Sequence, residues 1–293
     1  APPVAPPSVT ASAPVITSAS AAPPVGPPPE DMAWIAAGTF LMGEAKEARS
    51  VTITRPFYLD RNEVTVRAFQ LCVDKRMCSA ADHVSVTAEN DGSDAGPSAA
   101  TSAYVDTWTR RCNAPLRALD QPINCVDFAG AAGYCAWKGR RLPTEAEWEL
   151  AARGVDGRPF AWGREPPECG RSCYDRNGAC RRAGESVATC GAGAHPADRT
   201  PDGVFDLGGN VAEWVSDGFD RSLSGGRDPK GAEGAPLKVL RGGSFFDAEE
   251  HLRASFRTFA APVMAHATVG FRCAMDAPPG SISSGAPAGS AVP

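Results

Sequence analysis

The segment "VDFAGAAGYCAWKGRRLPTEAEWELAARG", residues 126–154, has the clearest local structural signals in the chain. Asp127 has the residue type of a helix N-cap, and Gly139 has the residue type that follows a helix C-terminus. After a short basic turn, Thr144 and Glu147 have the spacing of a capping box, which satisfies free backbone N–H groups at a helix start. The segment therefore predicts two short helices joined by a tight turn.

Short apolar runs separated by turn residues lie on both sides of this segment. Residues 32–44, "MAWIAAGTFLMGE", have a Gly-Thr break between two such runs, which predicts a β-hairpin. Residues 50–60 predict a further strand, and Thr65 is placed to cap a helix over residues 66–74. The predicted fold class is α+β, with few helices and much irregular chain. Further short strands are predicted in "KVLRGGSF", "LRASFRTF" and "VGFRCAM".

The composition divides the chain into a folded middle and two arms. Residues 1–30 and 277–293 consist largely of Pro, Ala, Ser, Val and Gly, which favours disordered, extended spacers. Residues 31–276 have the apolar content of one globular domain. Within that domain, residues 75–124 lose the periodic pattern and include a polar stretch rich in Gly and Ser, so we expect a long surface loop there.

Charge and hydropathy disfavour two classes of partner. The chain has 29 Lys and Arg residues and 34 Asp and Glu residues, a net charge of −5, and no basic run stands out. We therefore expect no nucleic-acid partner. No apolar stretch approaches the ~20 residues that a membrane-spanning helix needs, so we expect no transmembrane segment in this chain.

The chain has ten cysteines, an even and high number. They form no Cys-x-x-Cys pair, and the four histidines are not grouped with them, which disfavours a zinc site. Disulfides are the better interpretation, and they indicate an extracytoplasmic domain in the periplasm, on the cell surface or outside the cell. The cysteines are Cys72, Cys78, Cys112, Cys125, Cys135, Cys169, Cys173, Cys180, Cys190 and Cys273.

Seven motifs between residues 34 and 274 together resemble the formylglycine-generating enzyme (sulfatase-modifying factor) family. The resemblance covers nearly all of the predicted globular part. It implies an irregular α+β fold related to C-type lectins, with little regular secondary structure, stabilised by disulfides and calcium. In chain order the motifs are "WIAAGTFLMGE", "YLDRNEVTVRAF", "QPINCVDFAGAAGYCAWKGRRLPTEAEWELAARG", "FAWG", "DLGGNVAEWVSD", "VLRGGSF" and "VGFRCA".

The motif "DLGGNVAEW" contains oxygen donors of the kind that calcium prefers. Asp206 and Glu213 flank a Gly-Gly turn that exposes backbone carbonyls. The resemblance implies that Ca²⁺ is held by these two side chains and by the carbonyls of Gly209 and Val211. The alternative is that Glu213 pairs with an arginine and Asp206 only serves a turn. A second family calcium site is expected in the cysteine-rich stretch before this motif, where no ligands are assigned.

The resemblance also implies a disulfide between Cys135 and Cys273, against the alternative of two buried free thiols. Such a long-range bridge would contribute about 4–5 kcal/mol in the chain-entropy model. The other eight cysteines are expected to close local loops, in pairings that the sequence leaves open. The local pairs considered first are Cys72–Cys78 and Cys112–Cys125.

Catalytic members of the family oxidise a substrate cysteine with copper and oxygen, and they need two active-site cysteines, because thiolates bind Cu(I). The resemblance places those two positions at Asp247 and Leu252, beside the retained Ser244. We therefore do not expect copper or copper-dependent activity. A catalytic triad of Ser244, Asp247 and His251 is disfavoured as well, because the sequence has no nucleophile elbow.

The remaining aromatic and basic residues of the motifs are interpreted as structural. Trp108 lies in the insertion and is expected to be exposed. Arg140 and Arg141, in the turn between the two predicted helices, are expected to pair with carboxylates. The tryptophans expected in the core are Trp34, Trp137, Trp148, Trp162 and Trp214.

The sequence therefore predicts an extracytoplasmic, non-catalytic domain that acts as a recognition module for a peptide, a protein or a glycan. Its binding cleft is expected beside Ser244, Asp247 and the insertion around Trp108. The alternative is an oxidoreductase-type enzyme of the same family, with altered chemistry in that cleft and a protein or small-molecule substrate. A structural or adhesive role is the third interpretation.

Overall fold

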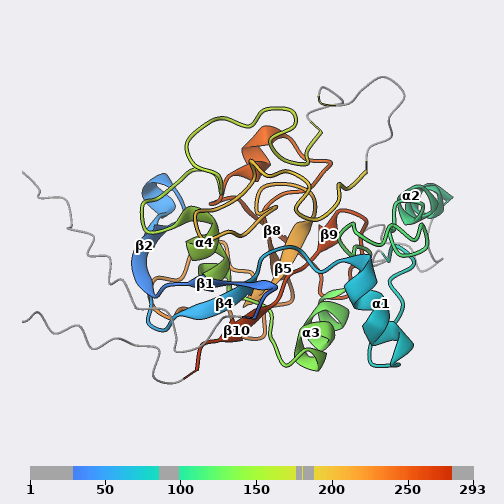
Figure 1. The fold of residues 1–293 in the computed structure, drawn as a ribbon, viewed down its shortest axis with the longest axis horizontal. Coiled ribbons are helices and arrows are strands. Elements are labelled where there is room, and N and C mark those ends of the chain that lie inside the picture. The colour runs from blue at the N-terminus through green and yellow to red at the C-terminus, as the bar shows by residue number, and fades with distance from the viewer. Residues whose placement is uncertain (1–28, 86–98, 176–179, 181–187, 279–293) are drawn as a thin grey trace, which may run out of the picture.

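The computed structural model describes residues 29–85, 99–175, 180 and 188–278. The predicted arms lie almost entirely outside these ranges, as do residues 86–98 of the insertion. The described chain folds into short helices and strands with long irregular connections (Figure 1). The predicted α+β class is confirmed. None of the described helices is long and apolar enough to cross a membrane.

Three small sheets contain the strands of the described chain. In the first, β4 pairs antiparallel with both β1 and β10. In the second, β3 pairs with β2 and β6, and in the third the order is β8-β7-β5-β9. The strands are β1 (Met32–Ile35), β2 (Gly38–Met42), β3 (Arg49–Ile53), β4 (Phe57–Asp60), β5 (Ala212–Gly218), β6 (Gly226–Arg227), β7 (Lys238–Arg241), β8 (Arg257–Ala260), β9 (Val269–Gly270) and β10 (Ala274–Asp276).

The predicted hairpin over residues 32–44 is wrong in its pairing. Both of its strands exist, but β1 pairs with β4, and β2 pairs with β3. All four residues of β4 are buried, and this strand has a partner on each edge, one of which is β1. The single strand predicted over residues 50–60 is likewise two strands, β3 and β4, in different sheets. The apolar pattern located strands without identifying their partners.

The three predicted helices are confirmed, together with their N-caps. Thr65, Asp127 and Thr144 each accept a hydrogen bond from the backbone N–H three residues later, at 3.2, 2.7 and 3.2 Å. Glu147 completes the predicted capping box at the third helix. These helices are α1 (Val66–Asp74), α3 (Phe128–Trp137) and α4 (Glu145–Arg153).

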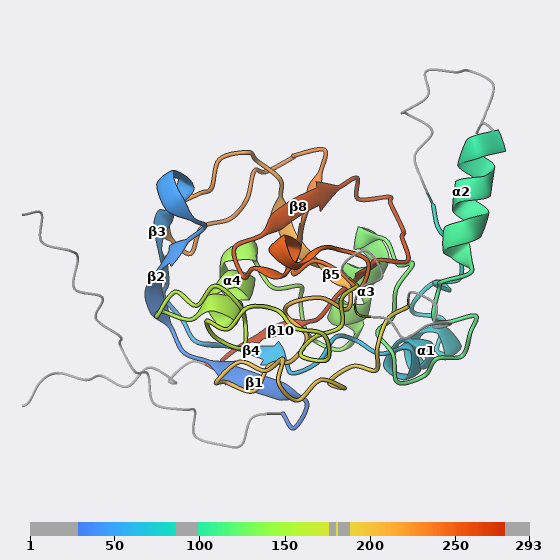
Figure 2. The ribbon, with the colours of Figure 1, turned by 90° about the horizontal axis from the view of Figure 1, so that it is seen from above.

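A fourth helix, α2 (Ala99–Thr109), lies in the insertion that we expected to be a loop. Its sequence, "AATSAYVDTWT", begins with alanine, the residue with the strongest intrinsic preference for helix. The Cys112–Cys125 disulfide ties the chain that follows α2 to the segment before α3. Figures 1 and 2 show α2 at the periphery of the molecule, on the same side as α1.

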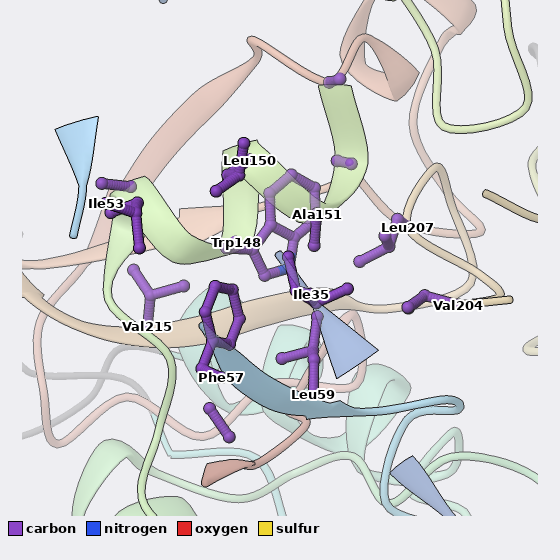
Figure 3. Packing of buried hydrophobic residues seen from close by; sticks show 14 of the residues in the cluster. Ile35, Ile53, Phe57, Leu59, Trp148, Leu150, Ala151, Val204, Leu207 and Val215 are labelled. Atoms are coloured by element: carbon purple, nitrogen blue, oxygen red, sulfur yellow. The ribbon is translucent and has the colours of Figure 1, made fainter. Parts of the chain in front are cut away.

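The largest hydrophobic core lies between α4 and the surrounding strands (Figure 3). Trp148 of α4 is 0% exposed, and its indole lies near the centre of this cluster. A second core joins α1, α3 and β9, where the ring centroids of Phe69 and Phe271 each lie 5.5 Å from that of Tyr134. In Figure 3 the labelled neighbours of Trp148 are Ile35, Ile53, Phe57, Leu59, Leu150, Ala151, Val204, Leu207 and Val215.

The expectations for the tryptophans are confirmed only in part. Trp148 and Trp214 are fully buried, whereas the other three expected core tryptophans are half-buried. Trp108 is also half-buried rather than exposed. Both turn arginines pair with carboxylates, as expected, in the contacts Arg140–Asp31, Arg140–Asp60, Arg141–Glu147 and Arg141–Asp276.

All ten cysteines are paired in five disulfides, and none is free. Cys135 of α3 is bonded to Cys273 beside β10, across 138 residues, which is the pairing that the family resemblance implies. The other four bridges close short loops and include two that interleave in the region before β5. These four are Cys72–Cys78, Cys112–Cys125, Cys169–Cys180 and Cys173–Cys190.

Candidate functional site

The Gly-Gly-Ser loop that follows β7 makes a sharp turn. Gly242 and Gly243 have φ angles of +92° and +69°, which side-chain-bearing residues rarely adopt. A Cβ atom at Gly243 would lie 2.8 Å from the carbonyl oxygen of His251. The two glycines thus let the loop pack against the following short helical turn, and Ser244 is left only 1% exposed.

Ser244, Asp247 and His251 form a hydrogen-bonded trio in this loop. The Ser244 hydroxyl donates to Asp247 Oδ2 at 2.7 Å, and His251 Nδ1 lies 3.0 Å from Asp247 Oδ1. The carboxylate therefore lies between the hydroxyl and the imidazole. In a catalytic triad the histidine occupies the middle position, where it takes the proton from the serine. This arrangement holds the loop together through hydrogen bonds to Asp247. It does not pair the serine directly with the histidine.

An aromatic surface, defined here as Tyr104, Trp108, Phe246 and His266, adjoins the same loop. The rings of Trp108 and Phe246 meet edge to face, with centroids 4.9 Å apart, and the His266 ring lies 4.6 Å from Trp108. Tyr104 is 46% exposed and Phe246 is 51% exposed. The structure thus brings the insertion next to the segment between Ser244 and Asp247, as the sequence analysis expected.

His266 forms the buried base of the aromatic surface. Its Nε2 atom lies 2.9 Å from the Tyr104 hydroxyl, and its Nδ1 atom lies 2.8 Å from Thr268 Oγ1. Burial lowers the pKa of His266 to about 4, so the imidazole is neutral near pH 7 and is a hydrogen-bonding part of the surface rather than a charge.

A small hollow in the structure shares no lining residue with the Gly-Gly-Ser loop or the aromatic surface. It contains about 10 Å³ of free space, roughly the room that one water molecule needs. Its lining mixes charged, small polar and apolar residues and includes Glu145, Asp217, Lys230 and Arg257. It is too small to be the binding cleft that the sequence analysis expected.

The "DLGGNVAEW" motif forms a tight turn that leads into β5. Asp206, Gly209 and Asn210 all have positive φ angles, and Asp206 is 1% exposed. One carboxylate oxygen of Asp206 accepts a hydrogen bond from Gly193 N at 2.5 Å. The other, Oδ1, is buried and has no hydrogen-bond partner among the described residues.

Glu213, at the end of the motif, pairs with Arg272. Arg272 Nη2 donates to Glu213 Oε1 at 2.6 Å, and Trp148 Nε1 donates to Glu213 Oε2 at 2.8 Å. Arg272 and Glu213 are 0% and 1% exposed. The structure therefore contains the arginine contact that we considered as the alternative for Glu213. Asp206 and Glu213 lie in one region, where both act on the pKa of the same neighbouring carboxyl groups.

Glu63 is a third buried carboxylate in this region. Its two oxygens accept hydrogen bonds from Val211 N at 3.1 Å and from Asn210 Nδ2 at 2.6 Å. Burial, together with the charges of Asp206 and Glu213, raises the pKa of Glu63 well above its usual value. Glu63 thus holds the backbone of the turn from inside the molecule.

Asp198 is the fourth buried carboxylate in this region, and it has the fewest hydrogen-bond partners. It is 1% exposed, and in the described chain neither of its carboxylate oxygens has a hydrogen-bond partner. Burial raises its pKa, and the charge of Asp206 raises it further. Burial also raises the pKa of Asp206, to about 6. Two neighbouring buried carboxyl groups therefore have oxygens without hydrogen-bond partners in the described chain, although Arg272 lowers the pKa of both and Arg171 lowers that of Asp198.

The carboxylates and backbone carbonyls of this turn are oxygen donors, and His195, whose carbonyl accepts from Asp198 N, has a buried Nδ1 atom without a hydrogen-bond partner among the described residues. In the residues that the structure describes, no three His, Cys, Asp or Glu side chains converge in a metal-binding arrangement. A cation at this turn would therefore need backbone carbonyls and water besides two carboxylates, which is a donor set that suits calcium. The buried oxygens of Asp198 and Asp206 that lack partners fit such a group.

Comparison with known proteins identifies the family. Residues 18–277 match the sulfatase-modifying factor enzyme 1-like domain. The chain belongs to this family. It is 32% identical over 248 residues to a formylglycine-generating enzyme of Streptomyces coelicolor, covering 76% of this chain and 79% of that protein.

Other relatives in the sulfatase-modifying factor family include a protein of Mus musculus named inactive C-alpha-formylglycine-generating enzyme 2. It is 32% identical over 169 residues, which cover 54% of this chain and 50% of the relative. Among solved structures, PvdO from Pseudomonas aeruginosa is 23% identical, with a TM-score of 0.58 over 84% of this chain and 94% of PvdO. That likeness shows the shared fold.

Asp247 and Leu252 occupy the positions that the resemblance to catalytic family members assigns to cysteines. Asp247 is engaged by Ser244 and His251. Leu252 is 0% exposed and packs with Phe160 in a small apolar cluster. Because every cysteine is in a disulfide, no free thiol is available to supply a thiolate ligand at this loop.

Sequence reasoning missed several residues of both regions. Phe246, whose predecessor Phe245 is buried, is exposed, and the "FF" pair gave no sign of which ring faces solvent. Tyr104 and Trp108 are four residues apart and hence lie on one face of a helix, but that helix was not predicted. The missed residues are Glu63, Tyr104, Asp198, Phe246, His266 and Arg272.

Proposed function

We propose that this domain is a calcium-stabilised, extracytoplasmic recognition module that lacks the copper-dependent oxidase chemistry of its catalytic relatives. The observation that carries the proposal is the state of the cysteines: all ten are in disulfides, while Asp247 and Leu252 stand at the positions assigned to the catalytic pair. A relative named as an inactive enzyme supports a non-catalytic role within the family. The five disulfides support an oxidising, extracytoplasmic environment.

The binding region in this proposal is the aromatic surface beside the Gly-Gly-Ser loop. Trp, Tyr and Arg are the residue types that contribute most to protein interfaces. This surface contains Tyr104 and Trp108, and Arg111 adjoins it. The Arg111 guanidinium lies over the Trp108 ring, 5.0 Å from its centroid, and His266 also contacts that ring. Because neighbours already cover the indole, the surface favours a protein or peptide partner over a stacked sugar.

The copper part of the proposal is tested by titrating the purified protein with Cu(I) in competition with a thiolate-sensitive probe. We expect no tight copper site in the unmodified chain. The matched positive control is the double variant Asp247→Cys and Leu252→Cys, which restores two thiols at the loop and is expected to gain copper affinity. A tight site in the unmodified chain would refute the proposal in favour of an oxidase.

The recognition part is tested by placing a photo-crosslinking amino acid at position 246 and irradiating living cells that produce the domain. We expect one dominant protein adduct, which the Trp108→Ala substitution weakens at least tenfold. The matched control is the same amino acid at position 41, because Leu41 of β2 is equally exposed, at 50%. Equal adducts at the two positions, or no effect of Trp108→Ala, would contradict the assignment of this surface.

A further inference from the structure

Asp198 has the most unfavourable environment of the buried carboxyl groups. Its carboxylate is 1% exposed, and neither oxygen is hydrogen-bonded within the described residues. An unpaired carboxylate buried in this way destabilises the fold unless a proton or a cation neutralises it. Its backbone carbonyl accepts from Asp206 N at 3.4 Å, so the two aspartates are neighbours in space as well as in charge.

Two arginines, Arg272 and Arg171, favour the charged form of Asp198, but neither donates a hydrogen bond to its carboxylate. Arg272 directs its Nε and one Nη2 contact to Glu213. Its remaining contacts go to four backbone carbonyls. Those carbonyls belong to Asp60, Arg61, Phe205 and Asp206. One guanidinium thus faces a cluster of four carboxyl groups, Glu63, Asp198, Asp206 and Glu213, and it pairs directly with only one of them.

Hydrogen-bond partners already hold two of the four carboxyl groups, those of Glu213 and Glu63. Glu213 is held by Arg272 and Trp148, and Glu63 accepts from the turn backbone and from Asn210. The free acceptors that remain are both oxygens of Asp198 and Oδ1 of Asp206. Three buried oxygens from two adjacent carboxylates, with no sulfur donor, favour a hard divalent cation over a transition metal.

From these contacts we infer that calcium in this chain is held by Asp198 together with Asp206, and that Glu213 is not a ligand but the partner of Arg272. The inference rests on the calcium part of the proposed function and changes its ligand set. Backbone carbonyls of the Gly-Gly turn and water complete the coordination, since calcium takes six to eight oxygens. Asp198 replaces Glu213 as the second carboxylate.

The test uses the full chain, freed of divalent ions with EGTA, and measures calcium binding by calorimetry and the calcium-dependent shift in melting temperature. We expect Asp198→Asn, which keeps the shape and removes the charge, to weaken the calcium Kd at least tenfold and to remove most of the shift. Glu213→Gln is expected to lower the melting temperature both with and without calcium and to keep the shift. Asp202→Asn, an exposed neighbour, is the charge-matched control and should bind calcium like the unmodified chain.

The possible outcomes distinguish a failure of this inference from a failure of the proposed calcium binding on which it rests. If the unmodified chain binds no calcium at all, both fail. If it binds calcium and Asp198→Asn binds equally well, only the assignment of Asp198 is overturned. If Glu213→Gln abolishes the shift while Asp198→Asn retains it, the ligand set implied by the resemblance holds instead.

Discussion

Replacing Cys135 and Cys273 together by alanine is expected to lower the free energy of unfolding by about 4–5 kcal/mol. The bridge spans 138 residues, and the entropy that a crosslink removes from the unfolded chain grows with the length of the closed loop. Both residues are 0% exposed and lie in the core that joins α1, α3 and β9. Urea unfolding followed by circular dichroism measures the loss, through the midpoint and the slope of the transition.

The matched control for that prediction is the double variant Cys72→Ala and Cys78→Ala. This bridge spans only 6 residues, so the same relation gives a loss of about 2 kcal/mol. Cys72 is also 0% exposed, which makes the packing loss comparable for one member of each pair. Equal losses in the two double variants would show that loop length does not govern the contribution of these disulfides.

The helices and their caps were predictable because their signals are local. Thr65, Asp127 and Thr144 bond to a backbone N–H only three residues away, so residue type and spacing suffice to identify them. The seven motifs likewise identified the family, because their order along the chain is itself information. The Cys135–Cys273 pairing came from the family resemblance, whereas composition and spacing left it open.

The strand partners and the carboxylate cluster were not predictable from local patterns. β1 and β2 lie next to each other in sequence, yet they join different sheets. Glu63 contacts Asn210 across 147 residues, and Arg272 contacts Glu213 across 59. Nothing in the residues around Asp198 marks it as buried, because its environment is assembled from segments distant in sequence. Single-sequence reasoning recognises donors such as Asp206 and Glu213 without showing which of them another side chain already holds.

The insertion is another feature that local sequence patterns did not predict, and it contributes to the candidate binding region. Residues 75–124 were predicted as a loop because their composition is polar, and α2 lies within them. The helix places Tyr104 and Trp108 beside His266, which lies more than 150 residues later in the chain. The sequence analysis named Trp108 and the Gly-Gly-Ser loop as neighbours, and they are neighbours in the structure. That a partner binds there stays a prediction. The sequence analysis could not foresee that Arg111 and His266 cover the indole ring.

Replacing Arg272 by methionine is expected to destabilise the domain by about 3–5 kcal/mol, because it leaves the buried Glu213 carboxylate without its counter-ion. Arg272 is 0% exposed and donates to Glu213 and to four backbone carbonyls. Methionine fills part of the space and donates to none of them. Urea unfolding in saturating calcium, and again in EGTA, gives the loss in each condition.

A double-mutant cycle separates the charge effect from the lost carbonyl contacts. Glu213→Gln neutralises the carboxylate and keeps an oxygen that can accept from Trp148 Nε1, so the double variant Arg272→Met, Glu213→Gln is expected to be more stable than Arg272→Met alone. The coupling energy for this contacting pair is expected to be about 1–3 kcal/mol. A coupling near zero would show that Arg272 stabilises the fold through the carbonyls rather than through Glu213. Removing Arg272 also leaves the carboxylate cluster without its buried cation, so calcium should stabilise Arg272→Met more than it stabilises the unmodified chain.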